Sequence, residues 1–185
     1  NIMENIIVTG GLGFIGLNLI SYLTNKKKYF IHNIDNYSLG HTYFEEFLTN
    51  DQKKLVQNYK LDINEKFQIK NILKNKNIKK IYNLAAESHV DRSISGPIDF
   101  YKSNVMGTLN LVETCRDYIE ENNIQDFKFL HVSTDEVFGD LTSNQESFSE
   151  ETPYNPSSPY SSSKAASDFI IKSWFRTYNF PGIVT

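Results

Sequence analysis

Short apolar runs alternate along this chain with stretches in which apolar residues recur at helical spacing. The first run, Ile6–Val8, leads through a glycine-rich turn into a helical pattern that starts at Phe14 and reaches the lysines at 26–28. Such alternation predicts an α/β fold with a doubly wound parallel sheet and right-handed crossovers. The expected strands cover residues 6–8, 30–34, 56–61, 81–84 and 127–132, and the expected helices cover residues 14–26, 67–73, 97–121 and 160–178.

Length and composition are those of an ordinary soluble domain. The 185 residues lie in the single-domain range, and 39% hydrophobic with 22% charged residues is an average balance. A net charge of -3 argues against a nucleic-acid-binding surface. The apolar runs are too short for a transmembrane span or a signal peptide, and the single cysteine, Cys115, fits a reducing, cytoplasmic compartment.

The sequence stops where another strand would begin. Residues 183–184 form an apolar start after Pro181-Gly182, and the chain ends one residue later, at Thr185. We therefore expect residues 1–185 to be a C-terminally truncated fragment that forms one domain. The polar stretch 142–159 is the only expected linker.

A glycine-rich turn joins the first strand to the first helix. Gly10, Gly13 and Gly16 are spaced three apart, and glycine lets the backbone turn tightly and approach a pyrophosphate at the helix N-terminus. Asp35 follows Gly16 by nineteen positions, at a strand end where a carboxylate binds an adenosine ribose diol and repels a 2′-phosphate. The pattern therefore favours NAD over NADP. Residues 62–63 end the third strand, and by the same geometry we expect them to flank the adenine.

A tyrosine and a lysine lie together at the start of the last expected helix. Tyr160 and Lys164 are four positions apart, so they share one face. An ammonium group near a phenol favours the phenolate, which lowers the pKa of the tyrosine and makes it a usable base. A surface tyrosine beside an exposed lysine is the common alternative. The glycine turn, Asn104 in the preceding helix and the hydroxyl residues after the fifth strand favour the catalytic interpretation.

Hydroxyl and carboxyl side chains follow the fifth expected strand, within residues 131–139. Ser133 and Thr134 precede the adjacent acids Asp135 and Glu136. An acid pair after an apolar strand is more often a turn former than a catalytic pair. Two adjacent acids can also act as a general acid and a general base, provided that their environments separate their pKa values. The neighbouring motifs favour this second interpretation.

These motifs resemble those of the extended short-chain dehydrogenase/reductase family. The Gly-x-x-Gly-x-x-Gly turn, Asn104 and Tyr160-x-x-x-Lys164 match its elements in the family's order. Residues 85–93, 133–139 and 158–168 read AAESHVDRS, STDEVFG and SPYSSSKAASD. They are similar to the nucleotide-sugar 4,6-dehydratases of that family, especially the dTDP-glucose 4,6-dehydratase type. The resemblance covers essentially the whole chain and implies a Rossmann fold with NAD as cofactor.

The resemblance also implies a reaction, the conversion of dTDP-glucose or UDP-glucose to its 4-keto-6-deoxy sugar by an NAD-dependent hydro-lyase. Tyr160, assisted by Lys164, would take the proton of the 4-hydroxyl while hydride passes to the nicotinamide, and Thr134 would bind the same oxygen. Glu136 would remove the carbon-5 proton, Asp135 would protonate the departing 6-hydroxyl, and the hydride would return to carbon 6. NAD is restored in every cycle, so it is expected to stay bound.

The same match assigns the remaining site residues. Ser88 is expected to face the nucleotide-sugar substrate together with Thr134, Asp135 and Glu136. His89 is interpreted as a structural hydrogen-bonding residue, and no metal site is expected, because the histidines lack metal-ligand spacing. The expected cofactor-binding residues are Gly10, Gly13, Phe14, Ile15, Gly16, Asp35, Asn36, Ser38, Asp62, Ile63, Leu84, Ala85, Ala86, Ser88, Ser103, Tyr160 and Lys164.

Two other functions remain open. A nucleotide-sugar 4-epimerase or decarboxylase of the same family would share the glycine turn and the Tyr/Lys pair but not the acid pair, and a non-catalytic NAD-binding regulator would keep only the fold. The resemblance further implies that a C-terminal domain beyond Thr185 holds the nucleoside diphosphate. We therefore expect residues 1–185 to bind NAD but to turn over nucleotide sugar poorly. Homodimerisation is expected through the helices at 97–121 and 160–178.

Overall fold

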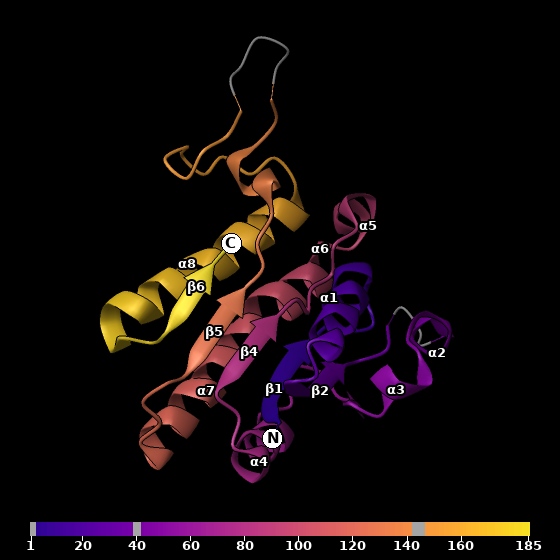
Figure 1. The fold of residues 1–185 in the computed structure, drawn as a ribbon. Coiled ribbons are helices and arrows are strands. Elements are labelled where there is room, and N and C mark those ends of the chain that lie inside the picture. The colour runs from indigo at the N-terminus through magenta and orange to yellow at the C-terminus, as the bar shows by residue number, and fades with distance from the viewer. Residues whose placement is uncertain (1–2, 39–41, 142–146) are drawn as a thin grey trace.

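In the part of the chain that the computed structural model describes, residues 3–38, 42–141 and 147–185, six parallel strands form one sheet (Figure 1). The sheet order is β3-β2-β1-β4-β5-β6, so the direction of winding reverses between β1 and β4. The doubly wound α/β fold predicted from the sequence is confirmed. The strands are β1 (Glu4–Thr9), β2 (Tyr29–Asp35), β3 (Val56–Lys60), β4 (Lys80–Asn83), β5 (Lys128–His131) and β6 (Gly182–Val184).

Helices pack on both faces of the sheet because successive strand residues point to opposite sides. Ile6 and Val8 belong to a buried cluster with Leu17 and Ile20 of α1, whereas Ile7 belongs to the cluster formed with α4, α7 and α8. Each of these fully buried isoleucines contributes about 2 kcal/mol of hydrophobic stabilisation. The helices are α1 (Phe14–Asn25), α2 (Thr42–Phe47), α3 (Asn50–Lys53), α4 (Lys66–Lys76), α5 (Val90–Ser95), α6 (Pro97–Phe100), α7 (Thr108–Asn122) and α8 (Pro159–Tyr178).

Three short helices, α2, α3 and α5, were not predicted because they are too short to show a hydrophobic period. Local capping accounts for α3 instead, since the Thr49 side chain and Gln52 satisfy each other's backbone N–H groups. The strand expected after Pro181-Gly182 is present as β6. Within the described residues, no helix is long and apolar enough to cross a membrane.

The helix expected at 97–121 is interrupted by a π-helical turn, η1 (Tyr101–Gly107), between α6 and α7. Asn104 lies in this turn and is buried. Its amide accepts from the Glu87 N–H at 2.8 Å and donates to the Glu87 carbonyl at 2.9 Å and to the Ser163 hydroxyl at 2.9 Å. The turn therefore anchors the loop after β4 to α8, a structural role that helical periodicity does not reveal.

The expected linker at 142–159 is more than a linker. Residues 142–146 lie outside the described residues, but the segment 147–158 packs against α8 through Tyr154. The Tyr154 ring centroid lies 5.1 Å from that of Phe169 and 5.3 Å from that of Phe138. Ser158 then caps α8 by accepting from the Ser161 N–H. Polar composition concealed these contacts, because a single aromatic side chain makes most of them.

Candidate active site

The glycine turn lies at the carboxyl end of β1, where the winding of the sheet reverses. Gly10 has a φ of +66°, and a Cβ there would lie 2.8 Å from the Ala85 backbone of the neighbouring strand end. A Cβ on Gly16 would lie 2.6 Å from the Cα of Gly11. Both positions therefore require glycine. The turn is held from β2, because Asp35 accepts from the Leu12 N–H at 3.0 Å.

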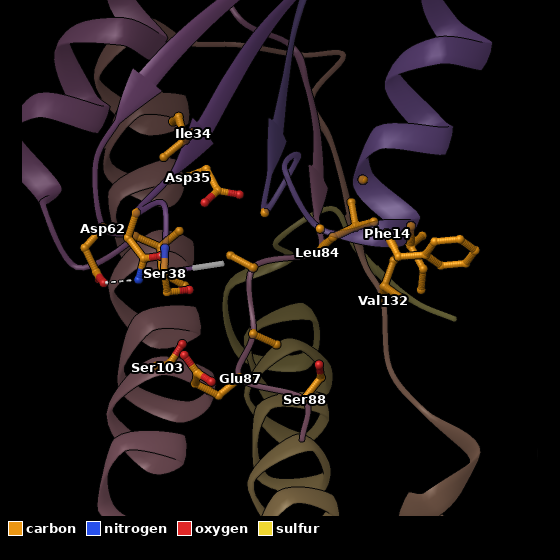
Figure 2. A pocket seen from close by; sticks show the side chains of 18 of the residues that line it. Phe14, Ile34, Asp35, Ser38, Asp62, Leu84, Glu87, Ser88, Ser103 and Val132 are labelled. Atoms are coloured by element: carbon orange, nitrogen blue, oxygen red, sulfur yellow. Dashed lines mark hydrogen bonds between the residues drawn. The ribbon is translucent and has the colours of Figure 1, made fainter. Parts of the chain in front are cut away.

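A cavity of about 440 Å³ opens beside this turn (Figure 2). Every residue that the sequence assigned to the cofactor lines it. Figure 2 shows Asp35 and Asp62 on one side, Phe14 and Val132 on the other, and Ser88 with Ser103 further along. The ends of β2, β3, β4 and β5, the glycine turn after β1, η1 and the start of α8 thus contribute to a single site. The cavity is additionally lined by Ile34, Leu61, Glu87, His89, Val132 and Ser133, which were not predicted.

The residues that were not predicted adjoin predicted ones. Ile34 and Leu61 directly precede Asp35 and Asp62. Their position at a strand end could therefore have predicted that they line the cavity. His89, interpreted from the sequence as a structural hydrogen-bonding residue, is exposed and lines the cavity, and its ring has no hydrogen-bond partner within the described parts of the chain. It lies just before α5 but does not cap that helix with its side chain.

Asp35 keeps acceptor capacity for a ligand although both of its oxygens contact the protein. Oδ2 accepts from Leu12 N–H and Oδ1 accepts from Tyr37 N–H at 2.8 Å. An ionised carboxylate has about four lone-pair sites, so roughly two remain. On the same side, the Asn36 amide lies 3.4 Å from a carboxylate oxygen of Asp62. This end of the cavity can bind a diol by accepting its hydroxyl protons.

Tyr160 and Lys164 point from the first turns of α8 toward the exit of β5. The Thr134 side chain lies close enough to the Tyr160 phenol to lower the pKa of Tyr160. The Lys164 ammonium is buried and donates to the Val132 carbonyl at 2.7 Å. The structure therefore brings together three of the five residues assigned to catalysis, at the exit of β5. Tyr160 and Lys164 also line the cavity, as the sequence predicted.

The prediction that Lys164 lowers the pKa of Tyr160 is wrong for this structure. Burial raises the pKa of Tyr160, and nearby carboxylates add to the rise, whereas the hydrogen bond with Thr134 opposes it. Lys164 is not among the groups that shift this pKa, and its ammonium group donates to a backbone carbonyl instead. Burial lowers the pKa of Lys164 itself to about 8. The phenol alone is thus a weaker acid than free tyrosine.

Asp135 and Glu136 lie in a short 3₁₀ turn, η2 (Asp135–Phe138), and do not line the cavity themselves. Thr134 begins the turn, and its hydroxyl accepts from the Glu136 N–H at 3.3 Å. Asp135 is exposed, whereas Glu136 is half-buried. Burial raises the pKa of Glu136, and the charges of Asp135 and Asp140 raise it further. The two acids therefore occupy different environments, as an acid and base pair requires.

A row of buried polar side chains crosses the sheet beneath the site. Strand register places Thr9, Asn83 and His131 side by side on β1, β4 and β5. Thr9 donates to Asn83 at 2.6 Å, Asn83 donates to Nδ1 of His131 at 3.0 Å, and Nε2 of His131 lies 3.1 Å from the Ser167 hydroxyl of α8. Since Ser167 donates to the Lys164 carbonyl, this network assigns the proton of His131 to Nε2.

No group of three or more His, Cys, Asp or Glu side chains in the described residues is arranged to hold a metal ion.

Comparison with known proteins places these features in a family. The family model described as GDP-mannose 4,6 dehydratase matches residues 7–185. The dTDP-glucose 4,6-dehydratase of Haemophilus influenzae is 44% identical over 99% of this chain and 55% of its own length. The chain spans about half the length of the curated relatives it matches.

Solved structures agree with the sequence comparison. The dTDP-glucose 4,6-dehydratase of Bacillus anthracis in complex with NAD is 35% identical, with a TM-score of 0.78 over 98% of this chain and 53% of that one. The dTDP-glucose 4,6-dehydratase of Streptomyces venezuelae, also with NAD bound, is 30% identical, with a TM-score of 0.85 over 98% of this chain and 54% of that one.

Proposed function

Because the chain belongs to the GDP-mannose 4,6-dehydratase family, we propose that it is the NAD-binding part of a nucleotide-sugar 4,6-dehydratase acting on dTDP-glucose or UDP-glucose. One observation carries the proposal. The Thr134 hydroxyl joins the cavity to the acid pair, since it lies beside the Tyr160 phenol and accepts from the Glu136 backbone N–H. Tyr160, proposed to take the proton of a sugar hydroxyl, and Glu136, proposed to take the neighbouring carbon-bound proton, are thus both linked to Thr134.

The cavity fits NAD. The turn before α1 brings backbone N–H groups to the end of a helix whose first turn has no acidic side chain, which suits a pyrophosphate. A Cβ on Gly13 would have only the Gly10 carbonyl near it, at 3.4 Å, so the backbone there is open to close approach. Asp35 is assigned to the adenosine ribose, and its charge favours NAD over NADP.

The residues of this chain then have separate tasks in the proposed reaction. A bound nicotinamide would accept a hydride reversibly and so allow position 4 to become a ketone. The ketone makes the proton on carbon 5 acidic. Tyr160 accepts the proton of the 4-hydroxyl, and Thr134 holds the same oxygen. Glu136 removes the carbon-5 proton, and Asp135 donates a proton to the departing 6-hydroxyl, which leaves as water. The hydride held by the nicotinamide would then return to carbon 6 while a proton returns to carbon 5. The raised pKa of Glu136 suits a base, because a higher pKa strengthens its affinity for the proton.

The proposed division of labour leaves nucleotide binding to another part of the protein. Residues 1–185 supply the cofactor cavity, and the nucleoside diphosphate is assigned to a C-terminal domain of the longer protein. The relatives support this, since this chain matches only about half of each. A cytoplasmic location belongs to the same proposal, supported by a single, buried cysteine.

Turnover of a complete chain tests the function. Full-length protein incubated with dTDP-glucose or UDP-glucose should release a 4-keto-6-deoxy sugar, whereas residues 1–185 should bind NAD and form little product. Product identity is measured by NMR and NAD binding by calorimetry. A 4-epimer as product would refute the dehydratase assignment in favour of an epimerase. Equal turnover by the 185-residue chain and the full-length protein would refute the proposed division of labour.

A homodimer is the proposed assembly, formed through the two helices that cover 97–121 and 160–178. Large apolar side chains on both are exposed, among them Ile98 at 68%, Met106 at 48% and Phe169 at 55%. Exposed apolar side chains gathered on neighbouring helices are typical of a surface that pairs with a partner. Light scattering is expected to report the mass of a dimer, and a monomer at high protein concentration would contradict the proposal.

A further inference from the structure

Asp168 is a fully buried carboxylate that the proposed chemistry leaves unused. It lies one turn beyond Lys164 on α8 and is 0% exposed. Its Oδ2 accepts from the Ser133 hydroxyl at 2.5 Å and from the Tyr154 hydroxyl at 3.0 Å. Its Oδ1 lies 3.4 Å from Nε2 of His131, long for a hydrogen bond, and has no other partner in the described parts of the chain. Burial of such a group is costly unless it is compensated.

The position of Asp168 on α8 connects it with the catalytic residues. Tyr160, Lys164 and Asp168 follow one another at intervals of four, so they share one face of the helix. That face contacts three consecutive residues after β5, at positions 132–134. Tyr160 lies beside Thr134, the Lys164 ammonium donates to the Val132 carbonyl, and Asp168 accepts from the Ser133 hydroxyl. Each of residues 132–134, which connect β5 to the acid pair, therefore contacts α8.

The charges around Asp168 indicate what its carboxylate does there. Burial lowers the pKa of His131, so this histidine stays neutral at pH 7. Lys164, one turn before Asp168 on α8, is then the buried cation that accompanies it. Burial lowers the pKa of Lys164, and the charge of Asp168 raises it. The groups that face Asp168 are Tyr160 and Lys164 on its own helix, His131 on β5, Tyr154 before α8 and, through the Tyr154 hydroxyl, Lys172.

We propose that Asp168 is a positioning residue of the active site: it holds Ser133 so that Thr134 meets Tyr160, and it is the counter-charge of the Lys164 ammonium. Its effect on turnover rests on the proposed function. Its effects on Thr134 and Lys164 do not, since they follow from contacts within α8 and between α8 and residues 132–134. Asp168 also holds the segment 147–158 against α8, because it accepts from the Tyr154 hydroxyl.

Asp168→Asn tests the counter-charge, because asparagine keeps the shape and removes the charge. The ε-carbon signal of Lys164, assigned by its loss in Lys164→Met, reports the pKa of Lys164 by ¹³C NMR. We expect that pKa to fall by about one unit in Asp168→Asn. Asp51→Asn, the same change at a side chain that is 91% exposed, should leave it unchanged. An unchanged pKa of Lys164 in folded Asp168→Asn would overturn the counter-charge role.

Ser133→Ala tests the positioning role without altering any charge. The ¹³Cζ signal of Tyr160, which senses hydrogen bonding of the phenol, should shift, while the pKa of Lys164 stays the same. In the full-length protein, kcat should fall about tenfold with KM unchanged. A wild-type Tyr160 signal would overturn the positioning role, and this variant decides the matter if Asp168→Asn does not fold. If wild-type protein has no dehydratase activity, the proposed function fails, and the two NMR signals still decide the inference.

Discussion

Replacing Glu136 by glutamine is expected to reduce formation of the 4-keto-6-deoxy sugar about 10³-fold in the full-length protein, because the amide cannot accept the carbon-5 proton. The shape of the side chain is kept, and Glu136 does not line the cofactor cavity, so NAD affinity should stay at the wild-type value. Product formation is measured by NMR and NAD affinity by calorimetry. Incorporation of solvent deuterium at carbon 5 should stop as well.

A matched control separates the chemistry from a general loss of charge. Glu150→Gln makes the same replacement at an exposed acid beyond the 3₁₀ turn and should leave turnover unchanged. If Glu136→Gln retained wild-type turnover, another group would be the base. If it lost NAD binding together with activity, the assigned role of Glu136 would be contradicted.

The pH dependence of kcat/KM in the wild-type protein should also show that Glu136 is the base. Burial raises the pKa of Glu136 above 4.5, and the Asp135 and Asp140 charges add to the rise. A base works in its ionised form, so kcat/KM should fall as pH drops through this raised pKa. Asp140→Asn removes one of the charges that raise it and should therefore move the acidic limb to lower pH. Movement to higher pH would contradict the assignment.

Gly16→Ala is expected to damage both the fold and NAD binding. The added Cβ would lie 2.6 Å from the Cα of Gly11 and 2.9 Å from its carbonyl carbon, and backbone atoms cannot give way as a flexible side chain can. We expect the free energy of unfolding to fall by about 2 kcal/mol and the NAD dissociation constant to rise about tenfold or more. Denaturant unfolding and calorimetry measure the two effects.

Two other glycines provide the comparison. A Cβ on Gly13 would lie 3.4 Å from the Gly10 carbonyl, yet Gly13 lines the cavity, so Gly13→Ala should weaken NAD binding with little loss of stability. A Cβ on Gly96 would lie 3.7 Å from the Arg92 carbonyl, away from the cavity, and Gly96→Ala should change neither quantity. Full NAD affinity in Gly13→Ala would contradict the pyrophosphate assignment, and wild-type stability in Gly16→Ala would contradict the packing argument.

The order of strands and helices could be derived from the sequence because it depends on local periodicity. Alternating apolar runs and helical patterns predicted the strands to within a few residues. The glycine turn together with Asp35 predicted the position of the cavity. The two sides of the cavity come from strand ends, and in a parallel sheet all carboxyl ends meet at one edge. Sequence position alone therefore brought Asp35, Asp62 and Ala85 to one place.

The amino-acid sequence by itself determined the fold class, the cofactor cavity and the shared helix face of Tyr160 and Lys164, since each follows from residue spacing within an element or from position at a strand end. Only the tertiary structure decided how these groups are charged and held. The rise in the pKa of Tyr160, the direction of the Lys164 ammonium and the contact of Asp168 with Ser133 all depend on burial and on partners 26 to 35 positions away. Desolvation and the field of distant charges act through space, so no local pattern encodes them.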